Sequence, residues 1–243
     1  MKISVCMASY NGAEFIEEQL KSILVQLNKD DEIVIVDDCS KDNTLYKIAL
    51  IDDSRIKIFK NISNKGHVFT FGRAISLAKN DIIFMSDQDD IWLKNRVVIM
   101  LDKLLNEKVL LVSSNTNFIN SKGDIIEYAT DGLQSSNSKK HFRNIIDIYV
   151  GKENYYGCAM AFKRELNKFI LPIPQYIESH DLWIASAANL LRLNAHCDDI
   201  TLSRRLHGNN ASIVKRHILS KLWSRMIFTR SIMQLIYRTL KKE

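Results

Sequence analysis

The sequence predicts an α/β fold: a mostly parallel, Rossmann-like sheet flanked by helices, with a C-terminal helical extension. Three observations predict it. Short apolar runs alternate with segments of helical periodicity, polar or acidic turns follow the apolar runs, and the last part of the chain is amphipathic and basic. A chain of 243 residues that is 46% hydrophobic is long enough to bury the core of one such domain.

The first half of the chain alternates strands and helices. Apolar or β-branched runs that end in turns predict strands at residues 2–8, 32–36, 55–59 and 82–85. Apolar residues spaced three and four apart predict helices at residues 14–27, 42–51 and 68–78. Strands joined through helices pair in parallel with right-handed crossovers, so their carboxyl ends share one edge of the sheet.

The second half of the chain has a looser pattern. Helices are predicted at residues 94–106 and 182–193, strands at 109–113, 158–162 and 195–202, and a polar loop at 204–212. We assign residues 1–213 to one domain, with a ligand-binding half at 1–117 and a second half at 118–213. Residues 214–243 form a basic amphipathic tail, predicted as one helix or a helix pair.

Charge and cysteine content exclude several classes of protein. Residues 215–243 hold eight Lys or Arg and one Glu, which leaves the rest of the chain with a net charge of −1. A neutral body without a nucleic-acid-binding motif argues against nucleic acid as a partner. Four scattered cysteines predict neither a zinc site nor a disulfide framework. Without a signal-peptide pattern or an apolar run of ~18 residues, we expect a cytoplasmic or peripheral membrane protein.

Three carboxylates follow the strand predicted at residues 82–85: Asp87, Asp89 and Asp90. Carboxylates two residues apart on a turn can face one cavity, and Mg²⁺ or Mn²⁺ prefers such oxygens together with substrate phosphates. The cluster therefore predicts a divalent-metal site. The alternative is an acidic cap on the next helix, and for Asp90 that alternative stays open, with Trp92 packed beneath it.

Other polar residues are expected at the same edge of the sheet. Asp37 and Asp38 follow the second strand, where a carboxylate can accept hydrogen bonds from a nucleobase or ribose or can cap the next helix. The shared edge should bring Asn11, Asp38, Lys65 and the acidic cluster together, where open α/β sheets bind ligands. The Ser9-Tyr10-Asn11 turn could equally be structural, and Lys65 a surface charge.

Two further candidates lie late in the chain. Asp181 follows His180 at the start of a predicted helix, and it is either a general base or an N-cap. His207 lies among Arg204, Arg205 and asparagines, and it is either a third metal ligand, a phosphate contact or an ordinary loop histidine.

Together these motifs resemble the inverting family 2 glycosyltransferases of the GT-A fold. The matching stretches are residues 5–11 (VCMASYN), 35–44 (IVDDCSKDNT), 64–66 (NKG), 86–90 (SDQDD), 179–183 (SHDLW) and 205–210 (RLHGNN). The resemblance covers residues 2–212 and is nearest to bacterial rhamnosyltransferases of surface polysaccharide synthesis. Residues 65–71 depart from the Gly-Val-rich form of the family, so donor contacts in that loop do not transfer.

The resemblance implies a role for each matching residue. Asp181 would be the catalytic base, Asp89 and Asp87 would bind Mn²⁺ or Mg²⁺ as the DXD motif, and His207 would complete the metal site. The implied nucleotide contacts are Ser9, Tyr10, Asn11, Asp38, Lys65 and Asp87. Acceptor or phosphate contacts are expected at His180, Trp183 and Arg205.

The implied reaction moves a sugar from a nucleoside-diphosphate sugar to a saccharide acceptor, expected to be lipid-linked and part of an O-antigen or capsule. The implied donor is dTDP-rhamnose, with UDP-glucose, UDP-galactose or UDP-N-acetylhexosamine as alternatives. A nucleotidyltransferase should carry a Gly-rich loop after the first strand, yet Gly12 is alone there. A glycoside hydrolase needs two facing carboxylates and no nucleotide site. A non-catalytic binding module is the remaining rival.

The basic tail suggests a location. Residues 215–243 could lie on an anionic membrane surface, at the cytoplasmic face of the inner membrane, where each Lys or Arg near the headgroups contributes ~1 kcal/mol. The alternatives are packing against the protein's own body or against a second subunit in a homodimer.

Overall fold

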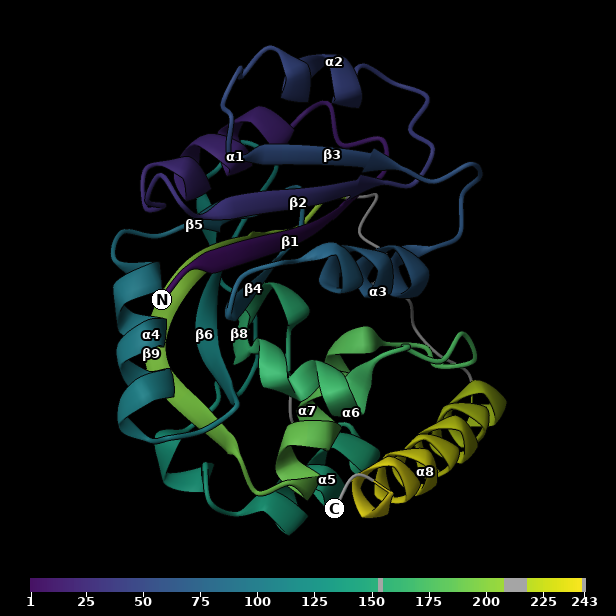
Figure 1. Cartoon of the computed structure of the whole chain (residues 1–243). Helices are drawn as coiled ribbons and strands as arrows, with labels where there is room; N and C mark the ends of the chain where they lie inside the picture. Colours follow the sequence, from purple (N-terminus) through teal and green to yellow (C-terminus); the bar gives the residue numbers. More distant parts are fainter. Residues whose placement is uncertain (153–154, 208–217, 242–243) are drawn as a thin grey trace.

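A mixed sheet runs through the part of the chain that the computed structural model describes, residues 1–152, 155–207 and 218–241 (Figure 1). Its first half consists of parallel strands in the order β3-β2-β1-β4. These strands are β1 (Ile3–Ser9), β2 (Glu32–Asp37), β3 (Ile56–Lys60) and β4 (Ile82–Ser86). The parallel βαβ arrangement predicted for the first half is therefore confirmed.

The second half of the sheet introduces antiparallel strands. β8 (Met160–Lys163) lies antiparallel between β4 and β6 (Leu111–Ile119), and β9 (Asn194–Arg205) runs parallel to β6. Two short strands, β5 (Ile91–Trp92) and β7 (Ile125–Ile126), pair antiparallel with β9 and β6. Because β8 runs against β4, the segment that enters β8 lies beside the turn that leaves β4.

Helices pack against the sheet. The α-helices are α1 (Ile16–Leu24), α2 (Thr44–Ala49), α3 (His67–Leu77), α4 (Arg96–Asn106), α5 (His141–Val150), α6 (Asn167–Ile170), α7 (His180–Leu190) and α8 (Ile218–Leu240). The 3₁₀ turns are η1 (Ser135–Asn137), η2 (Gly157–Ala159) and η3 (Arg164–Leu166). No helix within the described residues is both long and apolar enough to span a membrane.

Two differences from the sequence prediction bear on the site. Cys158 and Ala159, expected in a strand, form the 3₁₀ turn η2 ahead of β8. Arg204 and Arg205, expected in a loop, are the last residues of β9. The rest of that predicted loop from residue 208 on lies outside the described residues.

Alternate residues of the central strands feed two apolar cores, one on each face of the sheet. Val34, Val36 and Met85 pack with α3 and α7, whereas Val5, Ile35 and Phe84 pack with α1 and α4. The two-residue period of a strand explains this division, because neighbouring side chains point to opposite faces. Since each core side chain contributes ~1.5–3 kcal/mol when fully buried, these contacts fix the sheet under the site.

The C-terminal helix α8 packs against α6 and α7 (Figure 1). Leu235 is fully buried in the core beneath α8, and Arg238 donates hydrogen bonds to the carbonyl oxygens of Phe169 and Pro172. One face of the tail therefore packs against the protein's own body, as one alternative from the sequence proposed. The described part of the tail is a single helix.

Candidate active site at the carboxyl edge of the sheet

An acidic turn leaves β4 and crosses the carboxyl edge of the sheet. Asp87 and Asp89 are half-buried, whereas Asp90 is fully buried and accepts a 3.0 Å hydrogen bond from the backbone N–H of Arg205. Asp90 leads into β5, and α4 begins only at Arg96, with Asn95 at its N-cap position. The alternative that Asp90 caps the following helix is therefore wrong.

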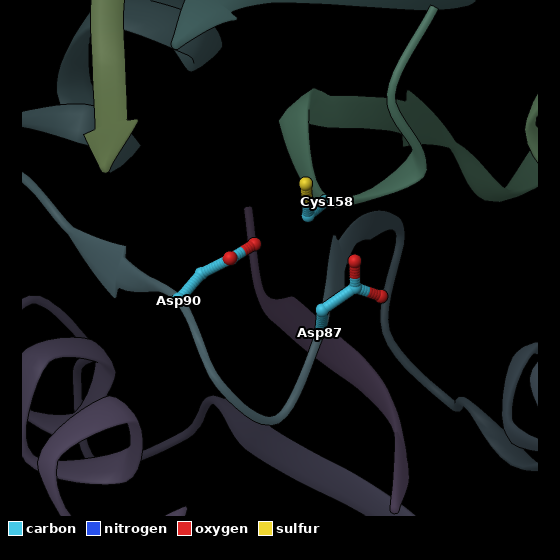
Figure 2. Close-up of side chains that lie close together, drawn as sticks. All are labelled: Asp87, Asp90 and Cys158. Carbon is cyan, nitrogen blue, oxygen red and sulfur yellow. The ribbon is translucent and has the colours of Figure 1, made fainter. Parts of the chain in front are cut away.

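Asp87, Asp90 and Cys158 form a cluster whose oxygen and sulfur atoms lie within 4.8 Å of one another (Figure 2). The two carboxylates come from the turn after β4, and the thiol comes from η2, immediately before β8. The antiparallel pairing of β8 with β4 produces this meeting. Cys158, which the sequence offered no reason to choose, thus belongs to the acidic site.

The carboxylates of the cluster resist ionisation. Burial, reinforced by the charges of Asp90 and Asp89, holds the pKa of Asp87 well above its usual range. Burial and the charge of Asp89 raise the pKa of Asp90 to about 7. Three acids gathered in one partly dry site repel one another, and a bound cation would relieve that repulsion.

Arg204 supplies positive charge beside the cluster. Its guanidinium lies over the ring of Tyr156 at 4.3 Å. Burial lowers the pKa of Arg204, but its electrostatic interactions with Cys158, Asp87 and Asp90 outweigh that effect and leave the pKa raised. Arg204 is therefore a cation at the edge of the acidic site, and a guanidinium is well suited to bind phosphate.

Asp89 pairs with His207, which follows the end of β9. Nε2 of His207 lies 2.9 Å from Oδ2 of Asp89, and this hydrogen bond raises the pKa of the imidazole. β9 runs parallel to β6 and so delivers its last residues to the edge where β4 ends. The structure thus brings together the two residues that were predicted to share the metal site.

The donor set fits a hard divalent cation. Oδ2 of Asp90 is buried and has no hydrogen-bond partner among the described residues, and the Asp87 carboxylate lies beside it. Mn²⁺ and Mg²⁺ prefer carboxylate oxygens, and an imidazole is acceptable to Mn²⁺. The residues that could hold the ion are Asp87, Asp89, Asp90 and His207. The Cys158 thiol is a softer group, and burial keeps its pKa well above the ordinary value, so it adds no negative charge.

The side chain of Arg205 forms hydrogen bonds within the protein. Its side chain is 2% exposed, and Nε donates to the carbonyl oxygen of Asp89 at 2.8 Å. The remaining nitrogens donate to the carbonyl oxygens of Asn120 and Ser121 and to the carboxylate of Glu18. The expectation that Arg205 contacts a phosphate or the acceptor is thus not supported, because its guanidinium is occupied in holding the acidic turn.

Asp37 and Asp38 organise the neighbouring loops. Asp37 accepts hydrogen bonds from the side chains of Ser9 and Ser40. The Asp38 carboxylate is buried and accepts from the Asn61 amide and from the backbone N–H groups of Lys65 and Gly66, at 2.7–2.8 Å. Asp38 and the backbone at residue 65 therefore meet as predicted, while the Lys65 side chain is exposed.

The loop after β1 is tied to the acidic turn by Gln88. The Gln88 amide accepts from the backbone N–H of Tyr10 at 2.9 Å and donates to the Tyr10 carbonyl at 3.0 Å. A Cβ atom at Gly12 would lie 2.2 Å from Oε1 of Gln88, so glycine is needed for this close approach. Asn11 is tied to the next loop, because its backbone N–H donates to Ser40 and its side chain accepts from the N–H of Lys41.

Asp181 lies in the first turn of α7. Ser179 is the N-cap of this helix, accepting from the N–H of Leu182, so the alternative that Asp181 is the N-cap is wrong. The Asp181 carboxylate accepts hydrogen bonds from the Gly157 N–H and the Ser179 hydroxyl, both at 3.0 Å. Burial raises the pKa of Asp181, but His180 and these donors lower it further, so the group is held ionised.

The neighbours of Asp181 are packed rather than open. His180 is buried, its ring stacks on Phe71 at 4.2 Å, and burial lowers its pKa. Trp183 is 2% exposed, and its indole N–H donates to the carbonyl oxygen of Ile170. The indole N–H of Trp183 is thus occupied within the protein, and the expectation that Trp183 and His180 contact the acceptor or a phosphate stays a prediction.

The turn η2 connects the two halves of the site. Gly157 binds Asp181 through its N–H, and the next residue, Cys158, contacts the acidic cluster. A Cβ at Gly157 would approach within 2.9 Å of His180 Nε2, which explains the glycine. An ionised carboxylate thus stands across η2 from an acidic cluster whose oxygens could hold a cation. This arrangement can remove a proton on one side while stabilising negative charge on the other.

Sequence reasoning missed Gln88, Gly157 and Cys158 and did not single out Arg204 as a site residue. Gln88 stands between two predicted ligands, so its position was a usable signal. Cys158 carried no spacing signal, because its partners are 68 and more residues away and meet it through β8.

The chain matches the family model described as Glycosyl transferase family 2 over residues 4–171. Over 223 residues it is 26% identical to the Escherichia coli protein UDP-Glc:alpha-D-GlcNAc-diphosphoundecaprenol beta-1,3-glucosyltransferase WfgD, covering 91% of this chain and 83% of the relative. Over 219 residues it is 33% identical to the Shigella flexneri dTDP-rhamnosyl transferase RfbG, covering 84% of this chain and 72% of the relative.

Solved structures share the fold. S. aureus TarS 1–349 in complex with UDP superposes with a TM-score of 0.71 at 17% identity, over 96% of this chain and 66% of that chain. The mannosyltransferase PcManGT from Pyrobaculum calidifontis, in complex with GDP-Man and Mn²⁺, superposes with a TM-score of 0.66 at 16% identity, over 97% and 73%. At these identities the likeness shows that the GT-A-like fold is shared.

The raised pKa of Asp90 predicts a pH-dependent stability. The unfolded carboxyl has a pKa of ~3.9, so between about pH 4 and pH 7 the folded state retains a proton that the unfolded state has released. Metal-free protein should therefore lose stability as the pH rises through this window. We expect Asp90→Asn to lose less, measured by urea denaturation in EDTA at pH 5 and pH 7.5.

The exposed Asp102→Asn variant on α4 is the matched control and should behave like the wild type. Adding Mn²⁺ at pH 7.5 should stabilise the wild type more than Asp90→Asn, because ligand binding to the folded state shifts the unfolding equilibrium. An equal pH-dependent loss in wild type and Asp90→Asn would contradict the assignment.

Proposed function

The chain belongs to glycosyltransferase family 2, and on that premise we propose that it transfers a sugar, with inversion, from a nucleoside-diphosphate sugar to an acceptor hydroxyl. The observation that carries the proposal is the ionised carboxylate of Asp181 across η2 from the acidic cluster. A transferase of this kind needs a base on the acceptor side and charge stabilisation on the leaving-group side.

In the proposed reaction Asp181 accepts the proton of the acceptor hydroxyl. The acceptor oxygen forms a bond to the anomeric carbon as the bond from that carbon to the diphosphate breaks. The low pKa of Asp181 keeps the base ready in its ionised form, and the N–H of Gly157 and the hydroxyl of Ser179 fix its orientation. A single displacement of this kind inverts the configuration of the sugar.

On the leaving-group side, Asp87, Asp89, Asp90 and His207 would hold Mn²⁺ or Mg²⁺. A divalent cation bound there would neutralise charge on the departing diphosphate. Arg204 lies close enough to the same carboxylates to raise its own pKa, so it is the protein's cation for a phosphate oxygen. The Asp90 pKa of about 7, raised by burial and by the charge of Asp89, supports a role for a cation, because a bound cation would stabilise the ionised carboxylates.

The nucleoside is proposed to lie over the loops after β1, β2 and β3. Ser9, Tyr10, Asn11, Asp38, Lys65 and Asp87 are the proposed contacts. Tyr10 is among the exposed aromatic residues, so its ring is available for stacking on a base. Asp38 already accepts three hydrogen bonds from the protein, and a carboxylate has about four acceptor positions, so one is left for a base N–H.

The donor and acceptor are inferred from relatives. RfbG is named as a dTDP-rhamnosyl transferase, which supports dTDP-rhamnose, whereas WfgD uses UDP-Glc and TarS was solved with UDP-GlcNAc. UDP-glucose, UDP-galactose and UDP-N-acetylhexosamine therefore remain the alternative donors. The WfgD acceptor is a diphosphoundecaprenol-linked sugar, and we propose a lipid-linked saccharide of a bacterial surface polysaccharide here. In this proposal residues 1–117 bind the donor and 118–213 bind the acceptor.

Asp181→Asn tests the mechanism. With Mn²⁺ and a panel of dTDP-rhamnose, UDP-glucose, UDP-galactose and UDP-N-acetylhexosamine, release of nucleoside diphosphate by the wild type identifies the donor. With that donor and acceptor, we expect Asp181→Asn to lower turnover ~10²–10⁴-fold, the usual contribution of a positioned base, while donor affinity is kept. Asp102→Asn should be unaffected, and wild-type turnover in Asp181→Asn would exclude this mechanism.

Gln88→Ala tests the connection between the donor loop and the acidic turn. Removing two hydrogen bonds to Tyr10, each worth ~0.5–1.5 kcal/mol, should weaken binding of nucleoside diphosphate with Mn²⁺ by about tenfold, measured by calorimetry. Gln26→Ala is a matched control, because Gln26 also bridges backbone groups, between Leu93 and Val97, away from these loops. Equal nucleotide affinity in both variants would remove Gln88 from the site.

A membrane location is proposed for the exposed face of α8. While one face of α8 packs on the body, the other exposes large apolar side chains: Leu222, Trp223, Met226, Met233, Ile236, Tyr237 and Leu240. The helix contains four Lys or Arg and no acid, and Lys241 follows it. An amphipathic helix with cations and interfacial aromatics is typical of a membrane-surface helix. A second subunit remains the alternative occupant of this face.

A Met226→Ser/Met233→Ser variant tests this location. We expect the wild type to co-float with vesicles that contain anionic lipid and the double variant to co-float several-fold less. Ile62→Ser, at a fully exposed apolar residue outside α8, is the control and should float like the wild type. If the double variant floats unchanged, or instead changes the oligomeric state in sedimentation, the face does not bind membrane.

A further inference from the structure

A cleft of about 390 Å³ lies between α5, α7 and α8, on the side of α7 that faces the C-terminal helix. Its volume is within the range of small-molecule sites. Apolar side chains form much of the wall: Ile148, Val150, Ile177, Leu182, Ile227 and Phe228. Such a wall fits a hydrocarbon.

Two cationic side chains and one carboxylate also line the cleft. Lys221 and Arg225 line the cleft one helical turn apart on α8, and Glu178 is the carboxylate among the lining residues. The Arg225 guanidinium lies over the ring of Tyr149 at 5.9 Å, which holds it beside the apolar surface. Two cations against one carboxylate give the cleft a net positive lining, and that charge is complementary to a diphosphate.

One hydroxyl in the cleft has no hydrogen-bond partner among the residues that the structure describes. Ser186 of α7 lines the cleft, is 1% exposed, and its Oγ makes no hydrogen bond to the described residues. A buried polar group without a partner is unfavourable and indicates a ligand or water that supplies one. Two serines of α8 also line the cleft, Ser224 and Ser231, and each donates a hydrogen bond to a carbonyl oxygen of its own helix.

The cleft is connected to Asp181 through Ser179. Ser179 lines it, and the Ser179 hydroxyl donates to Oδ1 of Asp181 at 3.0 Å. A molecule that contacts Ser179 in the cleft is therefore separated from the Asp181 carboxylate by one hydrogen-bonded side chain. The acceptor of a base-assisted transfer must approach Asp181, so the cleft is placed where part of an acceptor would lie.

We propose that this cleft binds the polyprenyl-diphosphate portion of the lipid-linked acceptor. Lys221 and Arg225 bind the diphosphate, the apolar wall receives the first isoprenoid units, and the attached sugar passes Ser179 to present its hydroxyl to Asp181. The inference rests on the proposed function and deepens it by giving the acceptor's lipid a place on this chain. The exposed face of α8 lies on the opposite side of the helix, where it can contact the bilayer from which the lipid comes.

Binding of farnesyl diphosphate, a soluble short polyprenyl diphosphate, tests the proposal on the full chain. We expect Lys221→Gln and Arg225→Gln each to weaken its binding at least tenfold by calorimetry. Lys241→Gln is the matched control, since Lys241 lies on the same chain segment but outside the lining of the cleft, and it should bind like the wild type. Inorganic diphosphate should bind at least tenfold more weakly than farnesyl diphosphate, because it lacks the hydrocarbon.

Three results would overturn the inference: no binding of farnesyl diphosphate, equal affinity in the wild type, Lys221→Gln and Arg225→Gln, or inorganic diphosphate binding as tightly as the lipid. Loss of flotation on anionic vesicles in Lys221→Gln without a change in farnesyl diphosphate affinity would assign the cations to the bilayer surface and equally overturn it. Donor hydrolysis by the wild type is a separate readout. Its absence would reject the proposed function, whereas hydrolysis without farnesyl diphosphate binding would reject this cleft alone.

Discussion

The buried guanidinium of Arg205 holds together segments that are far apart in the sequence. It binds the carbonyl oxygen of Asp89 after β4, the carbonyls of Asn120 and Ser121 after β6, and Glu18 in α1. The ring of Phe15 lies 4.6 Å from the guanidinium. A planar group with five fixed donors can serve so many acceptors at once, which an ammonium cannot. The acidic turn keeps its backbone conformation because Arg205 binds the carbonyl oxygen of Asp89.

With its backbone fixed, the acidic turn presents carboxylates that would otherwise separate. Burial, reinforced by the charges of neighbouring carboxylates, raises the pKa values of Asp87 and Asp90, whereas His180 and the hydrogen-bond donors around Asp181 lower the pKa of Asp181 despite its burial. The same edge of the sheet therefore carries two kinds of carboxylate with opposite tendencies. The acidic cluster favours a cation, whereas Asp181 stays ionised. Environment separates their roles, since the residue type is the same.

The C-terminal helix divides its residues between two environments. Leu235 and Arg238 attach α8 to the body, and the first turns of α8 complete a cleft that begins at Ser179. The opposite face exposes apolar side chains. In a transferase with a lipid-linked acceptor, one helix would thus contact the membrane, the lipid and the domain that carries the base.

The fold and much of the site could be predicted because their signals are local. A strand that ends in acids, a helix with a four-residue repeat and a basic tail are each readable within a few residues, and the parallel βαβ rule brings Asp38, Asp87 and Asp89 to one edge. The tail was predicted as one helix or two, and the structure describes one.

Contacts made through the antiparallel strand β8 and the end of β9 could not be predicted. Only the tertiary structure shows that Cys158 lies beside Asp87 and Asp90. It also shows that the indole N–H of Trp183 donates to the carbonyl oxygen of Ile170 and that the Arg205 side chain binds the carbonyl oxygen of Asp89. Strand order and direction in the second half of the sheet depend on packing between distant residues, which no local pattern records. The sequence alone thus determined which polar residues follow the strands at the carboxyl edge of the sheet, and the tertiary structure decided which of them meet there and which hold the acidic turn in place.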